Sequence, residues 1–89
     1  MPFKTRRIAQ KDLEEQADAI NEILNAPRGD PRSIGYKVGN HFIQYAYGGC
    51  ALQKVVTEGG CIIHPLGQGF YTKRELFEKL NQFILRGCK

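Results

Sequence analysis

The sequence predicts a small α+β domain in which two helices cover one face of a four-stranded antiparallel sheet. Three observations predict this fold. Glycine-containing turns separate short segments rich in aromatic and β-branched residues, and one amphipathic segment precedes them and another follows. The expected order is α-β-β-β-β-α, a two-layer sandwich. The length of 89 residues suits a single domain over residues 1–89.

The first helix is expected over residues 10–26. Its apolar residues recur at the spacing of one helix face: Leu13, Ala17, Ile20, Ile23 and Leu24. Pro27 ends this helix, because the residue before a proline disfavours helical geometry. Residues 1–9 are expected to be a flexible or extended N-terminal segment.

Strands are expected over residues 34–38, 41–47, 50–56 and 61–64. Gly39-Asn40 and Gly48-Gly49 are interpreted as two-residue turns, because Gly and Asn tolerate positive φ. A four-residue loop precedes the last strand. Short loops determine the register, which then places Phe42 opposite Val55 and Val55 opposite Ile62.

Alternation divides the side chains of these strands between two faces. Most apolar residues fall on one face, which we expect the helices to cover: Ile34, Tyr36, Val38, Ile43, Tyr45, Tyr47, Cys50, Leu52, Val56, Cys61 and Ile63. The other face is mostly polar or small. It carries one apolar row, Phe42–Val55–Ile62, and beside it the row Gln44–Gln53–His64.

This second face is the predicted functional surface. An uncovered sheet face is normally polar, so an aligned apolar row indicates a binding surface. We expect a non-enzymatic module that docks a protein partner, or itself as a homodimer, through six residues: Phe42, Gln44, Gln53, Val55, Ile62 and His64. Two alternatives stay open, namely cover by an N-terminal segment containing Phe3 and Ile8, and simple exposure.

The second helix is expected to begin at a capping box formed by Thr72 and Glu75 and to end at Gly87. Lys73 and Arg74 lie in its first turn, after a glycine-containing loop, and the chain carries a net charge of +4. Phosphate is favoured at such a position. The alternative function is therefore nucleic-acid binding, with these basic residues on phosphates: Lys73, Arg74, Lys4, Arg6, Arg7 and Arg32.

Thr72-Lys73-Arg74 resembles the opening of the second helix in the double-stranded RNA-binding domain. That family also places a helix, a meander and a second helix in this order, and the resemblance implies contact of the basic cluster with phosphates. The features expected for this chain differ from those of the family in three ways. Phe77 occupies the third basic position, four strands are expected rather than three, and the Gly39-Asn40 loop is too short to reach a second groove.

The sequence contains no residue pattern typical of a metal site or of a catalytic site. Cys61 and His64 are expected on opposite faces, and no CxxC or HxxxH spacing occurs, so we expect no metal site. No thiol or hydroxyl has a base within reach, and no paired carboxylates lie on the sheet, so no catalytic residue and no cofactor are expected. Cys50 and Cys61 would lie about 20 Å apart, which predicts free thiols.

The expected setting is the cytoplasm. No apolar run approaches the roughly 20 residues that span a bilayer, and the start of the chain lacks the apolar stretch of a signal peptide. We therefore expect a soluble protein without membrane contact.

Overall fold

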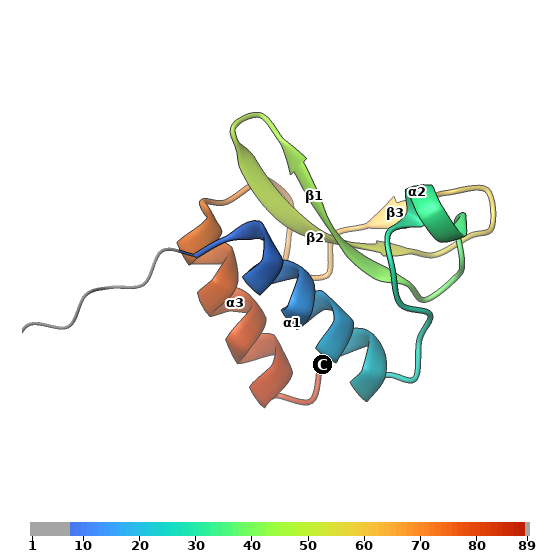
Figure 1. The fold of residues 1–89 in the computed structure, drawn as a ribbon, viewed down its shortest axis with the longest axis horizontal. Helices are drawn as coiled ribbons and strands as arrows, with labels where there is room; N and C mark the ends of the chain where they lie inside the picture. Colours follow the sequence, from blue (N-terminus) through green and yellow to red (C-terminus); the bar gives the residue numbers. More distant parts are fainter. Residues whose placement is uncertain (1–7, 89) are drawn as a thin grey trace, which may run out of the picture.

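The computed structural model describes residues 8–88 and shows a small α+β domain with a three-stranded antiparallel sheet. Figure 1 shows α1 and α3 together on one side of the sheet, and α2 apart from them, near β3. The elements follow one another in this order: α1 (Gln10–Ile23), α2 (Pro31–Ile34), β1 (His41–Ala46), β2 (Gly49–Val55), β3 (Ile62–Ile63) and α3 (Lys73–Leu85). The strand order in the sheet is β1-β2-β3.

The core lies between the sheet and the two long helices. It consists of nine buried side chains, three each from α1, the sheet and α3: Leu13, Ala17, Ile20, Ile43, Cys50, Leu52, Leu76, Leu80 and Phe83. The three from the sheet all belong to the face predicted to be covered. Each fully buried leucine contributes about 1.5–3 kcal/mol of transfer free energy.

The predicted strand over residues 34–38 is wrong. Asp30 instead caps the short helix α2, its Oδ1 accepting the N–H of Arg32 at 2.9 Å, and Pro31 occupies the first helical turn. An aspartate followed by proline is a strong helix start, and it prevails here over a weak alternation pattern. Tyr36 and Val38, predicted to be buried, are 53% and 52% exposed. The sheet therefore has three strands rather than four, and the domain has a third helix.

The turn between β1 and β2 is formed by Tyr47 and Gly48, not by Gly48-Gly49. Both residues have positive φ, 54° and 73°. The register places Phe42 opposite Gln53, so the predicted pairing of Phe42 with Val55 is wrong. Because the error is a shift of two residues, the side chains of β1 and β2 keep their predicted faces. Tyr47, predicted on the buried face, lies in the turn and is 94% exposed. The predicted pairing of Val55 with Ile62 is confirmed.

The predicted capping box of the last helix is confirmed. Thr72 Oγ1 accepts the N–H of Glu75, and Glu75 Oε1 accepts the N–H of Thr72, each at 3.1 Å. These bonds satisfy two of the N–H groups that a helix start leaves unpaired. They also hold the pKa of Glu75 below its usual value. At the other end of the chain, α1 stops at Ile23, and Leu24 is left 41% exposed rather than buried.

One buried amide joins α1 to the edge of the sheet. Asn21 is fully buried, and its Oδ1 accepts the N–H of His41 at 2.7 Å while its Nδ2 donates to the carbonyl of His41 at 2.9 Å. The Asn21 amide thus takes the place of a neighbouring strand for one residue of β1. The His41 Nδ1 also lies 3.1 Å from Asn21 Oδ1.

The buried ring of His41 is expected to make stability depend on pH. Burial lowers the pKa of His41 below 6.5, and the nearby Lys54 adds to the shift. As pH falls below about 6.5, the unfolded chain takes up a proton that the folded chain resists, so stability falls. Above that pH the imidazole is neutral in both states and contributes no slope. Urea unfolding at pH 7.5 and pH 5.5 should show this loss, and His41→Gln should remove most of it; an equal loss in the variant would contradict the assignment.

Candidate functional site

The open face, defined as the sheet face turned away from α1 and α3, carries a groove of about 600 Å³. Its floor comes from residues of β1, β2 and β3, and its walls come from the segments around α2 and before α3. These residues line it: Asp30, Pro31, Arg32, Tyr36, Phe42, Ile43, Gln44, Tyr45, Ala46, Tyr47, Gln53, Gly60, Ile62, His64 and Phe70.

Five of the six predicted partner-binding residues lie together in this groove: Phe42, Gln44, Gln53, Ile62 and His64. Val55 does not line it, because it is completely buried. The cover at that end of the sheet comes from the chain before β1. Asn40 holds this segment in place, since its Nδ2 donates to the carbonyls of Pro27 at 2.9 Å and Gly29 at 3.1 Å.

One polar side-chain atom on the floor of the groove lacks a partner. The Nδ1 of His64 is buried and has no hydrogen-bond partner within residues 8–88. Buried polar groups are nearly always hydrogen-bonded in folded proteins. Gln53, which lines the same groove, is only 5% exposed. The Nδ1 of His64 is therefore an open hydrogen-bonding position in the groove.

Aromatic rings form one end of the groove. The ring of Phe70 lies edge-on to Tyr47, with centroids 5.4 Å apart, and edge-on to His64 at 6.4 Å. Such pairs contribute about 0.5–1.5 kcal/mol beyond the area they bury. They hold His64 in a defined orientation next to the floor residues.

Tyr36 contributes to the opposite wall, and a glycine makes room for it. A Cβ added to Gly60 would lie only 3.0 Å from the Tyr36 Cε2, so a larger residue there would displace the ring. Sequence reasoning missed both Tyr36 and Phe70 as site residues. The signals available were the helix start at Asp30-Pro31, which removes Tyr36 from a strand, and the unexplained aromatic residue before the second helix.

Ile8, one of the two residues expected as a cover for the open face, packs against the core cluster instead, together with Tyr71 and Phe77. Phe3 lies outside the described residues, and so do three of the basic residues of the alternative site, Lys4, Arg6 and Arg7.

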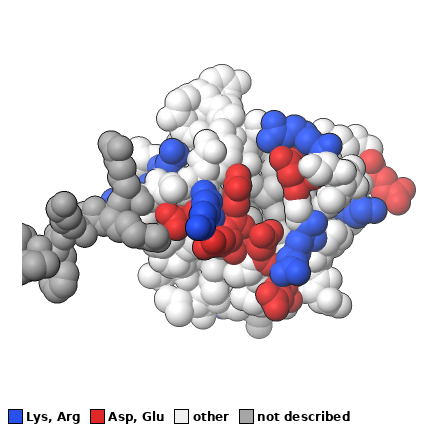
Figure 2. All heavy atoms as spheres, in the orientation of Figure 1, with Lys and Arg blue, Asp and Glu red and all other residues white. Residues whose placement is uncertain are grey.

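The other basic residues of the alternative site are not brought together. Lys73 and Arg74 are exposed in the first turn of α3. Arg32 lies on α2, where its Nη2 is 3.1 Å from Asp30 Oδ2, and this bond holds the pKa of Asp30 below its usual value. Figure 1 shows α2 and the start of α3 at opposite sides of the molecule. Figure 2 shows Lys and Arg interspersed with Asp and Glu over the displayed face.

The structure removes one of the three differences from the double-stranded RNA-binding domain, namely the number of strands. With three strands, the order α1-β1-β2-β3-α3 is that of the family, apart from the added α2. The other departures persist. Phe77 still stands at the third basic position, and the turn after the first strand, Tyr47-Gly48, again has only two residues.

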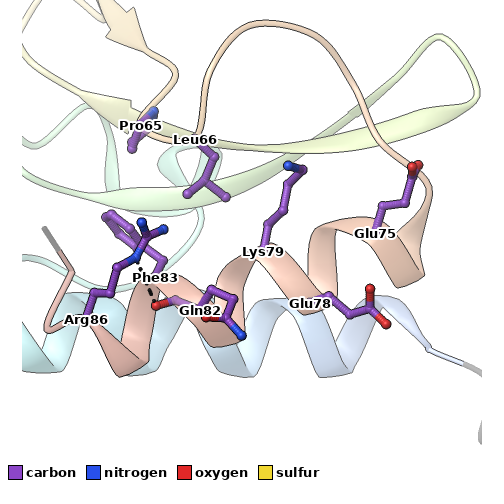
Figure 3. Close-up of a pocket in the computed structure, with 8 residues that line it drawn as sticks. All are labelled: Pro65, Leu66, Glu75, Glu78, Lys79, Gln82, Phe83 and Arg86. Carbon is purple, nitrogen blue, oxygen red and sulfur yellow. Dashed lines mark hydrogen bonds between the residues drawn. The ribbon is translucent and has the colours of Figure 1, made fainter.

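A second groove, of about 780 Å³, lies between α3 and the segment around Pro65 and Leu66. Figure 3 shows Leu66, Lys79 and Arg86 reaching into it from its two sides. Its charges are mixed, since Glu75 and Glu78 accompany Lys79 and Arg86, and the cations are engaged. The Lys79 Nζ lies 4.9 Å from the centre of the Tyr71 ring, and the Arg86 Nε donates to the Gln82 carbonyl at 3.4 Å.

The structure of residues 8–88 bears on metal binding and on membrane insertion. No group of three or more His, Cys, Asp or Glu side chains in this range is placed to hold a metal ion. Cys50, Cys61 and Cys88 are free thiols, and burial raises the pKa of Cys50 and of Cys88. None of the helices in this range has the length and apolar content needed to cross a bilayer.

The chain is a small α+β domain whose sheet carries a groove lined by aromatic residues. Comparisons with protein-family models, curated proteins and solved structures find no match to this chain. The geometry of the groove itself is therefore the guide to function.

Proposed function

We propose that this protein is a non-enzymatic binding module that docks a protein partner, or a second copy of itself, through the groove on its open face. The observation that carries the proposal is the floor of the groove. There the apolar Phe42 and Ile62 lie beside Gln53 and the unpaired, buried Nδ1 of His64. Apolar area provides affinity, and fixed polar groups provide orientation.

The residue types favour a protein as the occupant. Protein interfaces are enriched in tyrosine and phenylalanine, which supply large contact areas at a low cost in side-chain entropy. The groove presents five such residues: Tyr36, Phe42, Tyr45, Tyr47 and Phe70. The glutamines and the histidine on the same surface supply hydrogen bonds that a polypeptide backbone can complete.

Nucleic-acid binding through Lys73 and Arg74 is the alternative. Its support is the exposed basic start of α3 and the order of the five main elements. It uses a surface other than the groove, and it predicts a different response to salt. Affinity carried by phosphate contacts falls steeply as salt rises, whereas affinity carried by the apolar area of the groove is expected to fall much less.

A charge placed on the floor of the groove should abolish docking. Phe42→Asp would leave a carboxylate at the centre of the apolar contact, where its desolvation opposes binding, so we expect a loss of about 100-fold or more in affinity. The measurement is crosslinking followed by mass spectrometry in the native lysate, combined with light scattering of the purified protein to detect self-association. Circular dichroism checks that the variant is folded.

Leu85→Asp is the matched control, because Leu85 is 78% exposed near the end of α3, far along the chain from the groove residues. It should retain the partner or the oligomer. Loss of docking in Phe42→Asp alone supports the proposal. Retention of docking by folded Phe42→Asp would overturn it, and complexes dissolved by nuclease treatment would favour the nucleic-acid alternative.

A further inference from the structure

One edge of the sheet carries backbone groups that have no partner. Val55 N–H donates to the Asn40 carbonyl at 2.9 Å, so odd-numbered residues of β2 direct their backbone groups toward β1. Cys50 bonds instead to Tyr71, on the other side of β2. The register then requires the N–H and C=O groups of Ile43 and Tyr45 to point outward from β1.

The start of this edge is closed by α1. The outward groups of His41 are both taken up by the Asn21 amide. No hydrogen bond within the described chain takes up the backbone groups of Ile43 and Tyr45. The free edge is therefore a short one, bounded by the Asn21 contact at one end and by the Tyr47-Gly48 turn at the other.

A cavity of about 180 Å³ runs along the same edge, between α1 and the segment that includes α2. Ile43 and Tyr45 line both this cavity and the groove on the open face. A strand added at the edge would therefore direct alternate side chains into two different surroundings. One set would lie on the α1 side, and the other set would lie on the open face beside Phe42.

The α1 side of the edge is acidic. Glu14 and Asp18 line the cavity and are both exposed, and neither forms an ion pair within residues 8–88. Burial and the nearby Glu14 raise the pKa of Tyr45, so its hydroxyl stays neutral and adds no further charge. Arg32 is also present, but it is paired with Asp30. Charge complementarity on this side therefore favours basic side chains.

We propose that the partner supplies an extended basic peptide segment that adds a strand to the free edge of β1, bonding to the backbone of Ile43 and Tyr45. Lysine or arginine side chains of this segment face Glu14 and Asp18, and the alternate apolar side chains face the groove beside Phe42. The inference rests on the proposed function, because it names the kind of protein segment that the open face receives. Strand addition of this type derives its affinity from main-chain bonds and its specificity from alternate side chains.

The probe is a blocked peptide in which lysine and valine alternate over about six residues, enough to span the edge. It is titrated into the intact protein while backbone amides are followed by NMR. Amide exchange at Ile43 and Tyr45 should slow by about 10-fold or more at saturation, and their amide signals should shift more than that of Leu80 in α3. Methylation of the peptide backbone nitrogens should abolish binding, because it removes the donors.

The matched variant is Glu14→Gln with Asp18→Asn, which keeps size while removing charge. Its affinity for the peptide should fall about 3- to 10-fold at low salt, as expected for two exposed charge pairs. Replacing the peptide's lysines by glutamates should abolish binding. Absence of binding at millimolar peptide, or binding that leaves exchange at Ile43 and Tyr45 unchanged, would overturn the edge proposal.

This outcome is separable from failure of the proposed function. If Phe42→Asp loses its partner while Ile43 and Tyr45 stay unprotected, the open face binds a partner by another mode and only the edge proposal fails. If Phe42→Asp keeps its partner, the proposed function fails whatever the peptide does.

Discussion

Asn21→Ala is expected to lower the free energy of unfolding by about 2–5 kcal/mol, since it leaves a buried N–H and a buried carbonyl of His41 unpaired at about 1–3 kcal/mol each. Both bonds are short, 2.7 and 2.9 Å, and Asn21 is completely buried, so water cannot readily replace it. A small domain has only about 5–15 kcal/mol of stability in total. The measurement is the urea midpoint, together with amide exchange at His41, which should accelerate.

Glu15→Ala is the control for this change. Glu15 lies on the exposed side of the same helix, and its replacement should change stability by about 0.5 kcal/mol or less. The assignment would be wrong if Asn21→Ala cost no more than Glu15→Ala. It would also be wrong if the amide exchange rate of His41 were unaltered, because the His41 N–H donates to Asn21 Oδ1 and exchanges faster when that acceptor is removed.

Alternation along the chain was enough to predict which sheet side chains face the helices. Ile43, Cys50 and Leu52 are in the core as expected, although the turn between β1 and β2 was placed one residue too late. Side chains of a strand point to the same face every two residues. Because the error in the turn shifts the register by two residues, it does not change which face each side chain occupies. Strand alternation therefore predicts the faces correctly even when the turn is misplaced by one residue. It gives a wrong prediction where a helix-start signal lies next to an alternating segment.

The missed helix α2 is such a case. Residues 34–38 alternate apolar with polar or small side chains, but the Asp30 carboxylate and Pro31 start a helix immediately before them. The cap is a bond between neighbours in sequence, so it forms without help from the rest of the fold. Reading the start signal first would have left Tyr36 in a loop, where the structure has it.

The residues on the floor of the groove could be predicted from the sequence, and those on its walls could not. Phe42, Gln44, Gln53, Ile62 and His64 follow from strand alternation alone. Tyr36 and Phe70 are set by contacts between segments distant in sequence, with Gly60 and with Tyr47, and no local pattern encodes these. The burial of Val55 is also nonlocal, since the chain that covers this end is held by the bonds of Asn40 to Pro27 and Gly29.

Gly49→Ala should destabilise the domain by about 1–3 kcal/mol, the usual cost of forcing an extra methyl group into a packed site. A Cβ at Gly49 would lie 2.9 Å from the Tyr71 carbonyl oxygen and 3.2 Å from the Phe70 Cβ. The Tyr71 carbonyl accepts the N–H of Cys50 at 2.9 Å, and the Tyr71 N–H donates to Cys50 at 2.8 Å. The added methyl group must therefore lengthen the two hydrogen bonds between Cys50 and Tyr71 that attach this segment to β2.

Gly59→Ala provides the comparison, because a Cβ there would meet only Thr57 Oγ1, at an ordinary 3.8 Å. Both replacements restrict the unfolded chain to the same extent, so the difference between their urea midpoints isolates the contact at position 49. Equal midpoints would contradict it. Since Phe70 belongs to the groove, Gly49→Ala should also shift the NMR signals of the His64 ring, which would show that the attachment of this segment to β2 shapes the binding surface.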